Sequence, residues 1–177
     1  MKDAATADRP FSPRGLAWMA LLVVLTAIVG AIPTPDVPSS MDFSTGKALD
    51  HIAAIAQHPH PIGSPAAESA RRYIVEQLED LDLQPELQEF EAPDFFGISD
   101  GPVTGVNVAA RISGTDSTGA VMLVAHYDTV PTTPGAADDA SGVAVVLETA
   151  RALQDGAPLR NDVILLLTDG EEPAGRY

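Results

Sequence analysis

The sequence predicts an α/β fold, and three consecutive segments support this prediction. Two uninterrupted apolar runs, AVMLVA (120–125) and VILLLT (163–168), are typical of strands in a sheet that is covered on both faces. Between them, residues 141–154 have the spacing of an amphipathic helix, with Val143 and Leu147 on its apolar side. Strand, helix and strand in this order form a βαβ unit, whose parallel strands require a right-handed crossover.

The segments that precede this unit are predicted less uniformly. Residues 44–56 have helical spacing, and the proline-rich segment HPHPIGSP (58–65) ends that helix. A second amphipathic helix is predicted over 66–82. Apolar residues alternate over 106–112, which indicates a half-exposed strand, whereas the pattern of 84–103 does not decide between loop and weak strand.

Composition excludes several classes of function. The 177 residues include 10 Lys and Arg against 25 Asp and Glu, which gives a formal net charge of -15. A nucleic-acid partner is therefore not expected, because phosphate binding needs clustered basic side chains. The chain has no cysteine, so disulfide frameworks and thiolate sites are excluded, and a metal must be held by His, Asp and Glu.

The N-terminal region carries a candidate membrane span. Residues 16–32 have no charge, and with Gly15 they would extend about 27 Å as a helix, close to the bilayer core of about 30 Å. We therefore expect four parts: a tail (1–14), a transmembrane helix (15–32), a proline-rich linker (33–43) and a domain (44–177).

The distribution of basic residues predicts the orientation of this span. Lys2, Arg9 and Arg14 precede it, and the first basic residue after it is Lys47. The positive-inside rule then places the N-terminus in the cytoplasm and the domain outside it. The alternative is a cleaved signal peptide and a secreted domain, because Val29-Gly30-Ala31 resembles a cleavage site.

Acidic and imidazole side chains follow the two buried strands. His126 and Asp128 come directly after the first strand, and Glu171 and Glu172 follow the second. In open α/β sheets the functional groups gather at the carboxyl ends of the strands. Two residues apart on an extended chain, His126 and Asp128 face the same side, so Asp128 can fix the tautomer of a metal-binding imidazole.

A third acidic segment begins the helix between the strands. Asp138-Asp139-Ala140-Ser141-Gly142 places carboxylates at the helix N-terminus, and Gly142 permits close backbone approach. Each motif alone is weak, but together they predict a site for zinc, manganese or cobalt. His51, His58 and His60 are interpreted as packing or turn residues.

These residues also carry a resemblance to a known family. AHYDTVP (125–131), PGAADDASGVA (134–144) and LLLTDGEE (165–172) resemble the M28 family of zinc-dependent exopeptidases, in its membrane-anchored branch related to endoplasmic reticulum metallopeptidases. HPHPIGSP (58–65) and GVNVAARI (105–112) resemble the same branch. The resemblance implies a mixed sheet flanked by helices that cleaves N-terminal residues or short peptides.

The resemblance also implies roles for individual residues. His126 would bind one of two zinc ions, Asp138 would bridge them, and Glu172 would bind the other. Glu171 would be the general base, and Asp128 would orient and polarise His126. A peptide is the implied substrate.

Three alternatives stay open beside the exopeptidase. M20 peptidases share the HxDxVP motif, although the ten positions between Asp128 and Asp138 favour M28. A glutaminyl-cyclase-like acyl transferase would use a single metal, and a non-catalytic membrane ectodomain would keep the fold for partner binding. The family's further Asp and His ligands are expected after the Glu pair, and no His follows His126. We therefore expect an incomplete domain that is inactive in isolation.

Overall fold

The computed structural model describes residues 43–172. The predicted tail, transmembrane helix and nearly all of the linker (1–42) lie outside the described residues, so the structure does not test them. Within 43–172, no helix combines the length and the apolar character needed to cross a bilayer.

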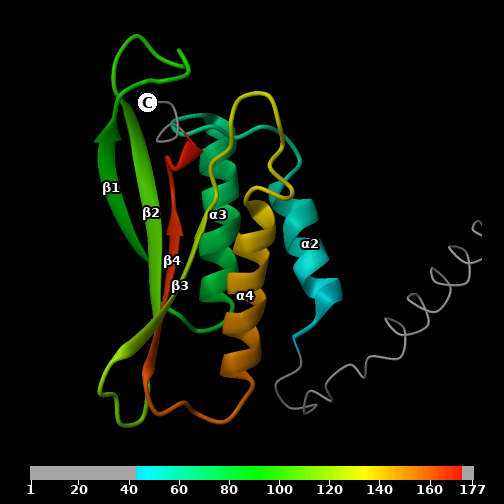
Figure 1. The fold of residues 1–177 in the computed structure, drawn as a ribbon, viewed down its shortest axis with the longest axis vertical. Helices are drawn as coiled ribbons and strands as arrows, with labels where there is room; N and C mark the ends of the chain where they lie inside the picture. The colour runs from blue at the N-terminus through cyan, green and yellow to red at the C-terminus, as the bar shows by residue number, and fades with distance from the viewer. Residues whose placement is uncertain (1–42, 173–177) are drawn as a thin grey trace, which may run out of the picture. The chain divides into compact units, whose positions relative to one another are not determined.

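The centre of the fold is a mixed sheet of four strands (Figure 1). The strands are β1 (Glu86–Ala92), β2 (Val103–Ile112), β3 (Ala120–His126) and β4 (Asp162–Thr168), and their order across the sheet is β1-β2-β4-β3. β3 and β4 are parallel, whereas β2 pairs antiparallel with both β1 and β4. The predicted α/β class is therefore correct, and β3, β4 and the helix between them form the predicted βαβ unit.

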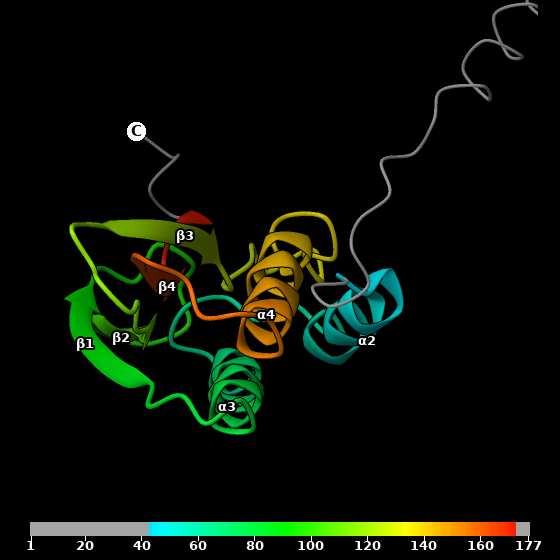
Figure 2. The same ribbon diagram turned by 90° about the horizontal axis from the view of Figure 1, so that it is seen from below.

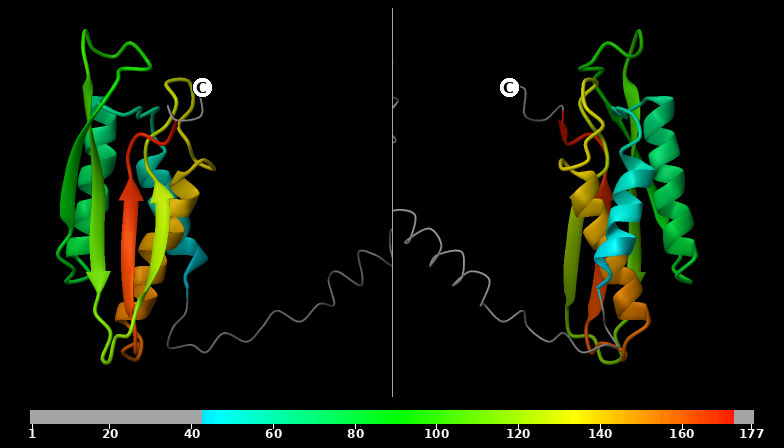
Figure 3. Two further views of the ribbon diagram at one scale, coloured as in Figure 1. Left: turned by 60° about the vertical axis from the view of Figure 1, so that its left-hand side comes forward. Right: turned by 90° about the vertical axis from the view of Figure 1, so that its right-hand side faces the viewer.

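Three helices lie on one side of this sheet, as Figures 2 and 3 show. They are α2 (Thr45–Ile55), α3 (Pro65–Glu79) and α4 (Ala140–Gln154). Two of them, α3 and α4, pack against the face of the sheet, and α2 packs mainly against α4. Each begins at a side-chain cap that accepts a backbone N–H, which is the usual way to satisfy the free donors of a first turn. The caps are Ser44, Ser64 and Asp139.

The core lies between the helices and the two central strands. Ile74 and Leu78 of α3, Val143 of α4 and Leu165 and Leu167 of β4 are completely buried there. Burying such side chains is the main stabilising contribution to a fold of this size. The apolar residues whose spacing predicted α3 and α4 are therefore the residues that these helices bury in the core.

The structure corrects one sequence prediction about the sheet. Uninterrupted apolar strands predicted cover on both faces, but Val121, Met122 and Val124 of β3 are 58%, 52% and 56% exposed. The reason is position: β3 is an edge strand, and the described helices cover only one face. The expectation of a sheet flanked by helices thus holds for one face within residues 43–172.

The structure also settles the segments whose pattern was weak. Residues 86–92 form strand β1, which pairs with β2 along its whole length, and β2 starts at Val103, three residues earlier than predicted. α3 ends at Glu79 instead of residue 82, because Asp82 adopts a φ of 57° and the Leu83 amide turns back to the Leu78 carbonyl.

Candidate metal centre

Three segments that are distant in sequence meet at one end of the sheet. Because β3 and β4 are parallel and His126 is in register with Thr168, their carboxyl ends lie side by side. The loop after β3 returns to start α4 beside the same end, as can be followed in Figure 1. The topology therefore brings the predicted site residues of all three segments together.

His126 is the centre of this cluster. Its Nδ1 lies 3.1 Å from the Asp128 carbonyl oxygen and 3.5 Å from the Asp128 carboxylate. Its Nε2 lies 3.1 Å from Asp138 Oδ1 and 3.8 Å from Glu171 Oε2. Since both neighbours of Nδ1 are acceptors, Nδ1 carries a hydrogen, and Nε2 is the nitrogen directed at the carboxylates of Asp138 and Glu171.

The surrounding carboxylates favour positive charge at this position. The hydrogen bond with Asp128, helped by Asp138, raises the pKa of His126 to about 9 although burial opposes it. Burial and the nearby charge of Asp138 raise the pKa of Glu172, whereas His126 lowers it. A concentration of acceptors around one imidazole is stabilised by a proton or by a metal cation.

Asp128 connects the two strand ends. Its side chain is fully buried, and its two oxygens accept the backbone N–H of Glu171 at 3.0 Å and that of Glu172 at 3.2 Å. One carboxylate therefore orients His126 and also holds the backbone of the Glu pair. Sequence reasoning assigned only the first of these contacts, because backbone donors from another strand leave no pattern in the sequence.

Asp138 and Asp139 have different environments although they are neighbours. The side chain of Asp138 is 82% exposed and reaches His126. Asp139 is the N-cap of α4 and accepts the N–H of Gly142 at 2.9 Å. A Cβ on Gly142 would collide with the Asp139 carboxylate, so the close approach predicted for this glycine is present.

The donor set agrees with zinc in chemistry and spacing, although the cluster is not a complete metal site. Imidazole nitrogen and carboxylate oxygen are ordinary zinc ligands, and two ligands of a tetrahedral zinc ion lie about 3.3 Å apart. The separation of His126 Nε2 and Asp138 Oδ1 is close to this value. Nevertheless, residues 43–172 hold no group of three His, Asp or Glu side chains placed to bind one ion.

The other histidines have neighbours outside this cluster. His51 forms a hydrogen bond with the Tyr73 hydroxyl at 2.7 Å. His60 is 2% exposed, its backbone N–H donates to Thr129 Oγ1, and its ring contacts the His58 carbonyl. The HPHPIGSP segment thus supports the loop that follows β3.

Two buried residues beside the cluster were not assigned a role from the sequence. Tyr127 donates to the Val106 carbonyl at 2.6 Å, and its hydroxyl oxygen lies 3.1 Å from Asp169 Oδ2. Burial raises the pKa of Asp169 to about 6, and it also raises the pKa of Tyr127. A buried acid next to an otherwise apolar strand end is the signal that could have singled out Asp169.

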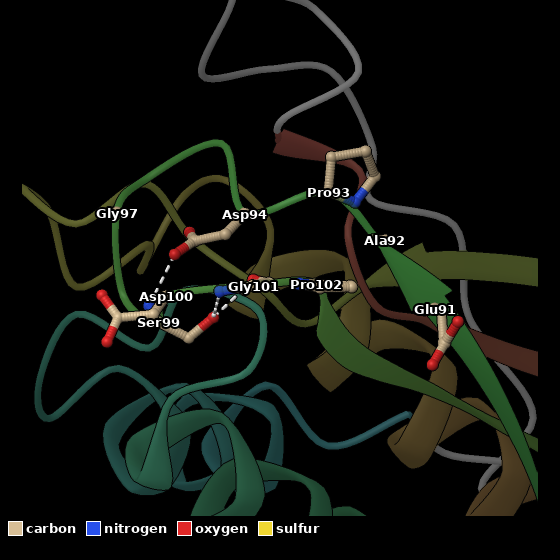
Figure 4. A pocket seen from close by; sticks show the side chains of 9 residues that line it. All are labelled: Glu91, Ala92, Pro93, Asp94, Gly97, Ser99, Asp100, Gly101 and Pro102. Carbon is tan, nitrogen blue, oxygen red and sulfur yellow. Dashed lines mark hydrogen bonds between the residues drawn. The ribbon is translucent and has the colours of Figure 1, made fainter.

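A separate hollow of about 650 Å³ lies within the loop between β1 and β2 (Figure 4). It is lined by nine residues from 91–102, and none of the predicted site residues is among them. Asp94 accepts the Ser99 amide across this loop, and backbone hydrogen bonds lower the pKa of Asp94. These contacts stabilise the conformation of the loop, and they do not form a second candidate active site.

Comparison with known proteins gives consistent matches. The sequence model described as "Peptidase family M28" matches residues 107–175. The vacuolar membrane protease of Schizosaccharomyces japonicus is 32% identical over an aligned length of 136 residues, and the match covers 71% of this chain and 16% of the relative. The chain spans 16% to 20% of the length of the first curated relatives that it matches.

Solved structures show the same fold. A glutaminyl cyclase from Porphyromonas gingivalis is similar with a TM-score of 0.66 and 27% identity, over 73% of this chain and 46% of that chain. An aminopeptidase from Aneurinibacillus sp. strain AM-1 is similar with a TM-score of 0.67 and 16% identity, over 74% of this chain and 64% of that chain. The fold of residues 43–172 is therefore that of zinc-exopeptidase-like proteins.

Proposed function

Because residues 107–175 belong to peptidase family M28, we propose that this chain carries part of the active site of a metal-dependent exopeptidase of the aminopeptidase type. The observation that supports the proposal is the meeting of His126, Asp138 and Glu171 within 4 Å at the carboxyl ends of β3 and β4. The four-strand sheet supplies the rigid elements that such a site requires.

The contacts of His126 with Asp128 and Asp138 support the roles proposed for these three residues. His126, Asp138 and Glu172 would hold zinc, with Asp138 shared between two ions, and Asp128 would keep the imidazole in its tautomer. When bound, zinc would lower the pKa of a water molecule and polarise the scissile carbonyl.

Glu171 would act as the general base. Its side chain is 61% exposed, so a water molecule and a substrate can reach it. Glu171 would accept a proton from the attacking water and later donate it to the leaving amine nitrogen. Glu172 is less exposed and is held beside Asp138, which suits a ligand better than a base.

Peptide binding, membrane attachment and the state of this chain are part of the proposal. The curated relatives are named vacuolar membrane proteases, which supports association with a membrane. The anchor at 15–32 with a cytoplasmic N-terminus, or a secreted form after signal cleavage, is proposed from the sequence. Within residues 43–172, no three His, Asp or Glu side chains are placed to hold one ion, whereas a zinc ion takes three or four protein ligands. We expect the 177-residue chain to bind zinc weakly and to lack hydrolytic activity by itself.

The test is a charge-neutral substitution of the base. In the longest natural polypeptide that contains these residues, Glu171→Gln should lower kcat by at least about 100-fold while zinc content is unchanged, because only proton transfer is removed. Cleavage of peptides with a free N-terminus is measured against N-acetylated peptides. Glu76→Gln, on the exposed side of α3, is the matched control and should keep full activity.

Full hydrolysis by the Glu171→Gln protein would remove Glu171 from the mechanism. Equal cleavage of acetylated peptides would contradict an aminopeptidase.

A glutaminyl-cyclase-like acyl transferase is the second candidate. It is favoured by the likeness of the fold to the Porphyromonas gingivalis glutaminyl cyclase. Cyclisation of peptides with N-terminal glutamine, together with one zinc ion per chain, would support this reading. Two zinc ions per chain and release of free amino acids would support the exopeptidase.

A further inference from the structure

We propose that Asp169 is a positioning residue, which acts through Tyr127 and the β2 backbone to hold the turn that presents Glu171 and Glu172. This inference rests on the proposed function of the Glu pair, since it concerns how that pair is kept in place. Asp169 is 5% exposed and touches none of the candidate ligands by its side-chain hydrogen bonds, so its role is distinct from theirs.

The side chain of Asp169 continues the sheet where the backbone leaves it. The β2–β4 ladder ends at the pair Val108 and Leu167. Beyond it, Asp169 Oδ2 accepts the Val106 N–H at 3.1 Å, and the Asp169 N–H donates to Asn107 Oδ1 at 3.1 Å. Two side-chain hydrogen bonds thus replace the ladder bonds that the turn interrupts.

The Tyr127 hydroxyl lies between the β2 backbone and the side chain of Asp169. The Tyr127 hydroxyl has one hydrogen, and its oxygen lies 2.6 Å from the Val106 carbonyl and 3.1 Å from Asp169 Oδ2. The carbonyl can only accept, so the shorter contact takes the hydroxyl hydrogen. The same hydroxyl faces Asp169 Oδ2 as its second acceptor, so Tyr127 links the Asp169 side chain to the β2 backbone.

The charged groups around Asp169 come from two other elements. Arg71 of α3 faces both Tyr127 and Asp169, and Asp128 faces Asp169 from the end of β3. Burial and the charge of Asp128 raise the pKa of Asp169, whereas Val106, Tyr127 and Arg71 lower it. Asp169 Oδ1 has no hydrogen-bond partner within the described part of the chain, which favours the neutral acid.

The turn at residues 169–172 is also held by packing at Gly170 and by hydrogen bonds to Asp128. Gly170 adopts a φ of 77°, and a Cβ there would lie 2.8 Å from Ile62 Cδ1, so the turn is packed closely. Beyond Gly170, the N–H groups of Glu171 and Glu172 donate to Asp128. These two amides can exchange with solvent only when the turn opens, and they therefore report its position.

Amide hydrogen exchange of the 177-residue chain tests the proposal. Asp169→Ala should accelerate exchange of Glu171 and Glu172 by about tenfold, the loss of roughly one buried hydrogen bond. Asp169→Asn keeps one of the two side-chain contacts of Asp169 Oδ2, with Val106 or with Tyr127, and should accelerate exchange of the two amides less than the alanine variant does. Tyr127→Phe should also accelerate both amides, and it keeps the test available if the alanine variant does not fold. Asp162→Asn, a buried acid at the opposite end of β4, is the matched control.

The pH profile separates positioning from simple packing. In the wild type, protection of Glu171 and Glu172, corrected for intrinsic exchange, should fall as the pH rises through about 6, and in Asp169→Asn it should not titrate. Unchanged exchange in Asp169→Ala, or equal acceleration in Asp162→Asn, would overturn the proposal. The exchange measurement needs neither metal nor substrate. Absence of peptidase activity in the longest natural polypeptide that contains these residues would therefore count against the proposed function alone.

Discussion

Asp128 illustrates at the scale of one residue how a buried carboxylate orders exposed groups. The side chains of Asp138 and Glu171 are 82% and 61% exposed, so solvent does little to fix them. Asp128 is fully buried, and it accepts the amides of Glu171 and Glu172 while facing His126 Nδ1. Charge-assisted hydrogen bonds in such surroundings are short-range and strong, so they determine where the backbone of the site lies.

A second effect at this scale is the pH dependence that Asp169 imposes on stability. Burial raises its pKa from 3.8 to about 6, so its contribution to the free energy of unfolding is fully present below pH 3.8 and is lost as the pH rises through about 6. The two limits differ by roughly 3 kcal/mol. We expect the stability of the wild type relative to Asp169→Asn to fall from pH 4 to pH 7, measured by urea unfolding.

Comparison of the wild type with Asp169→Asn isolates the titration of Asp169 from that of the other acids. Glu148 titrates in the opposite sense, since hydrogen bonds from Arg151 and the Ser44 amide outweigh its burial and lower its pKa. Its effect is present in both proteins and cancels. A difference in stability that does not change with pH would show that Asp169 is ionised throughout the range.

At the scale of elements, the loop between β3 and α4 decides where Asp138 lies. The Ala140 N–H donates to the Gly135 carbonyl at 2.9 Å, which closes the loop directly before the helix. Gly135 has a φ of 68°, a conformation that residues with a Cβ adopt at a cost. The start of α4 and the position of Asp138 therefore depend on one backbone conformation.

Substitution of this glycine should disturb the loop. A Cβ at Gly135 would lie 2.7 Å from the Asp138 carbonyl oxygen and would collide with the Thr129 methyl group. We expect Gly135→Ala to lower the free energy of unfolding by at least about 1 kcal/mol and to change the NMR signals of His126. Gly119→Ala is the control, because no atom lies within 4 Å of its Cβ. Equal stability of the two variants would contradict the role of Gly135.

At the scale of the whole described domain, the two edges of the sheet differ in chemistry. β1 carries Glu86, Glu89 and Glu91, and such charges discourage pairing with another chain. β3 carries the uncharged segment AVMLVA and exposes Val121, Met122 and Val124. An uncharged apolar edge strand is a ready partner for a second strand.

We therefore predict self-association through β3 and none through β1. Sedimentation of the 177-residue chain should show dimers or larger species that increase with salt, because salt screens the net charge of -15. Replacing Met122 and Val124 by Lys should shift the protein to monomer. Leu87→Lys, at an exposed position of β1, is the control and should leave association unchanged. An unaltered size distribution in the double variant would contradict the prediction.

The sequence alone determined those features that depend on neighbours along the chain. The strand at 120–125, the helix at 141–154 and the strand at 163–168 agree with the structure to within one residue, because periodicity and caps are local. The same local order, together with the parallel pairing it implies, placed His126, Asp138 and Glu171 at one sheet end.

Tertiary structure alone decided the features that depend on contacts between distant segments. The uncovered face of β3 depends on which elements pack on the sheet. The hydrogen bonds of Asp128 and Asp169 join segments that are 43 and 63 residues apart in sequence. Burial and backbone hydrogen bonding across such distances leave no periodic pattern. They arise only when the packed fold places one segment beside another, and for that reason the sequence could not predict them.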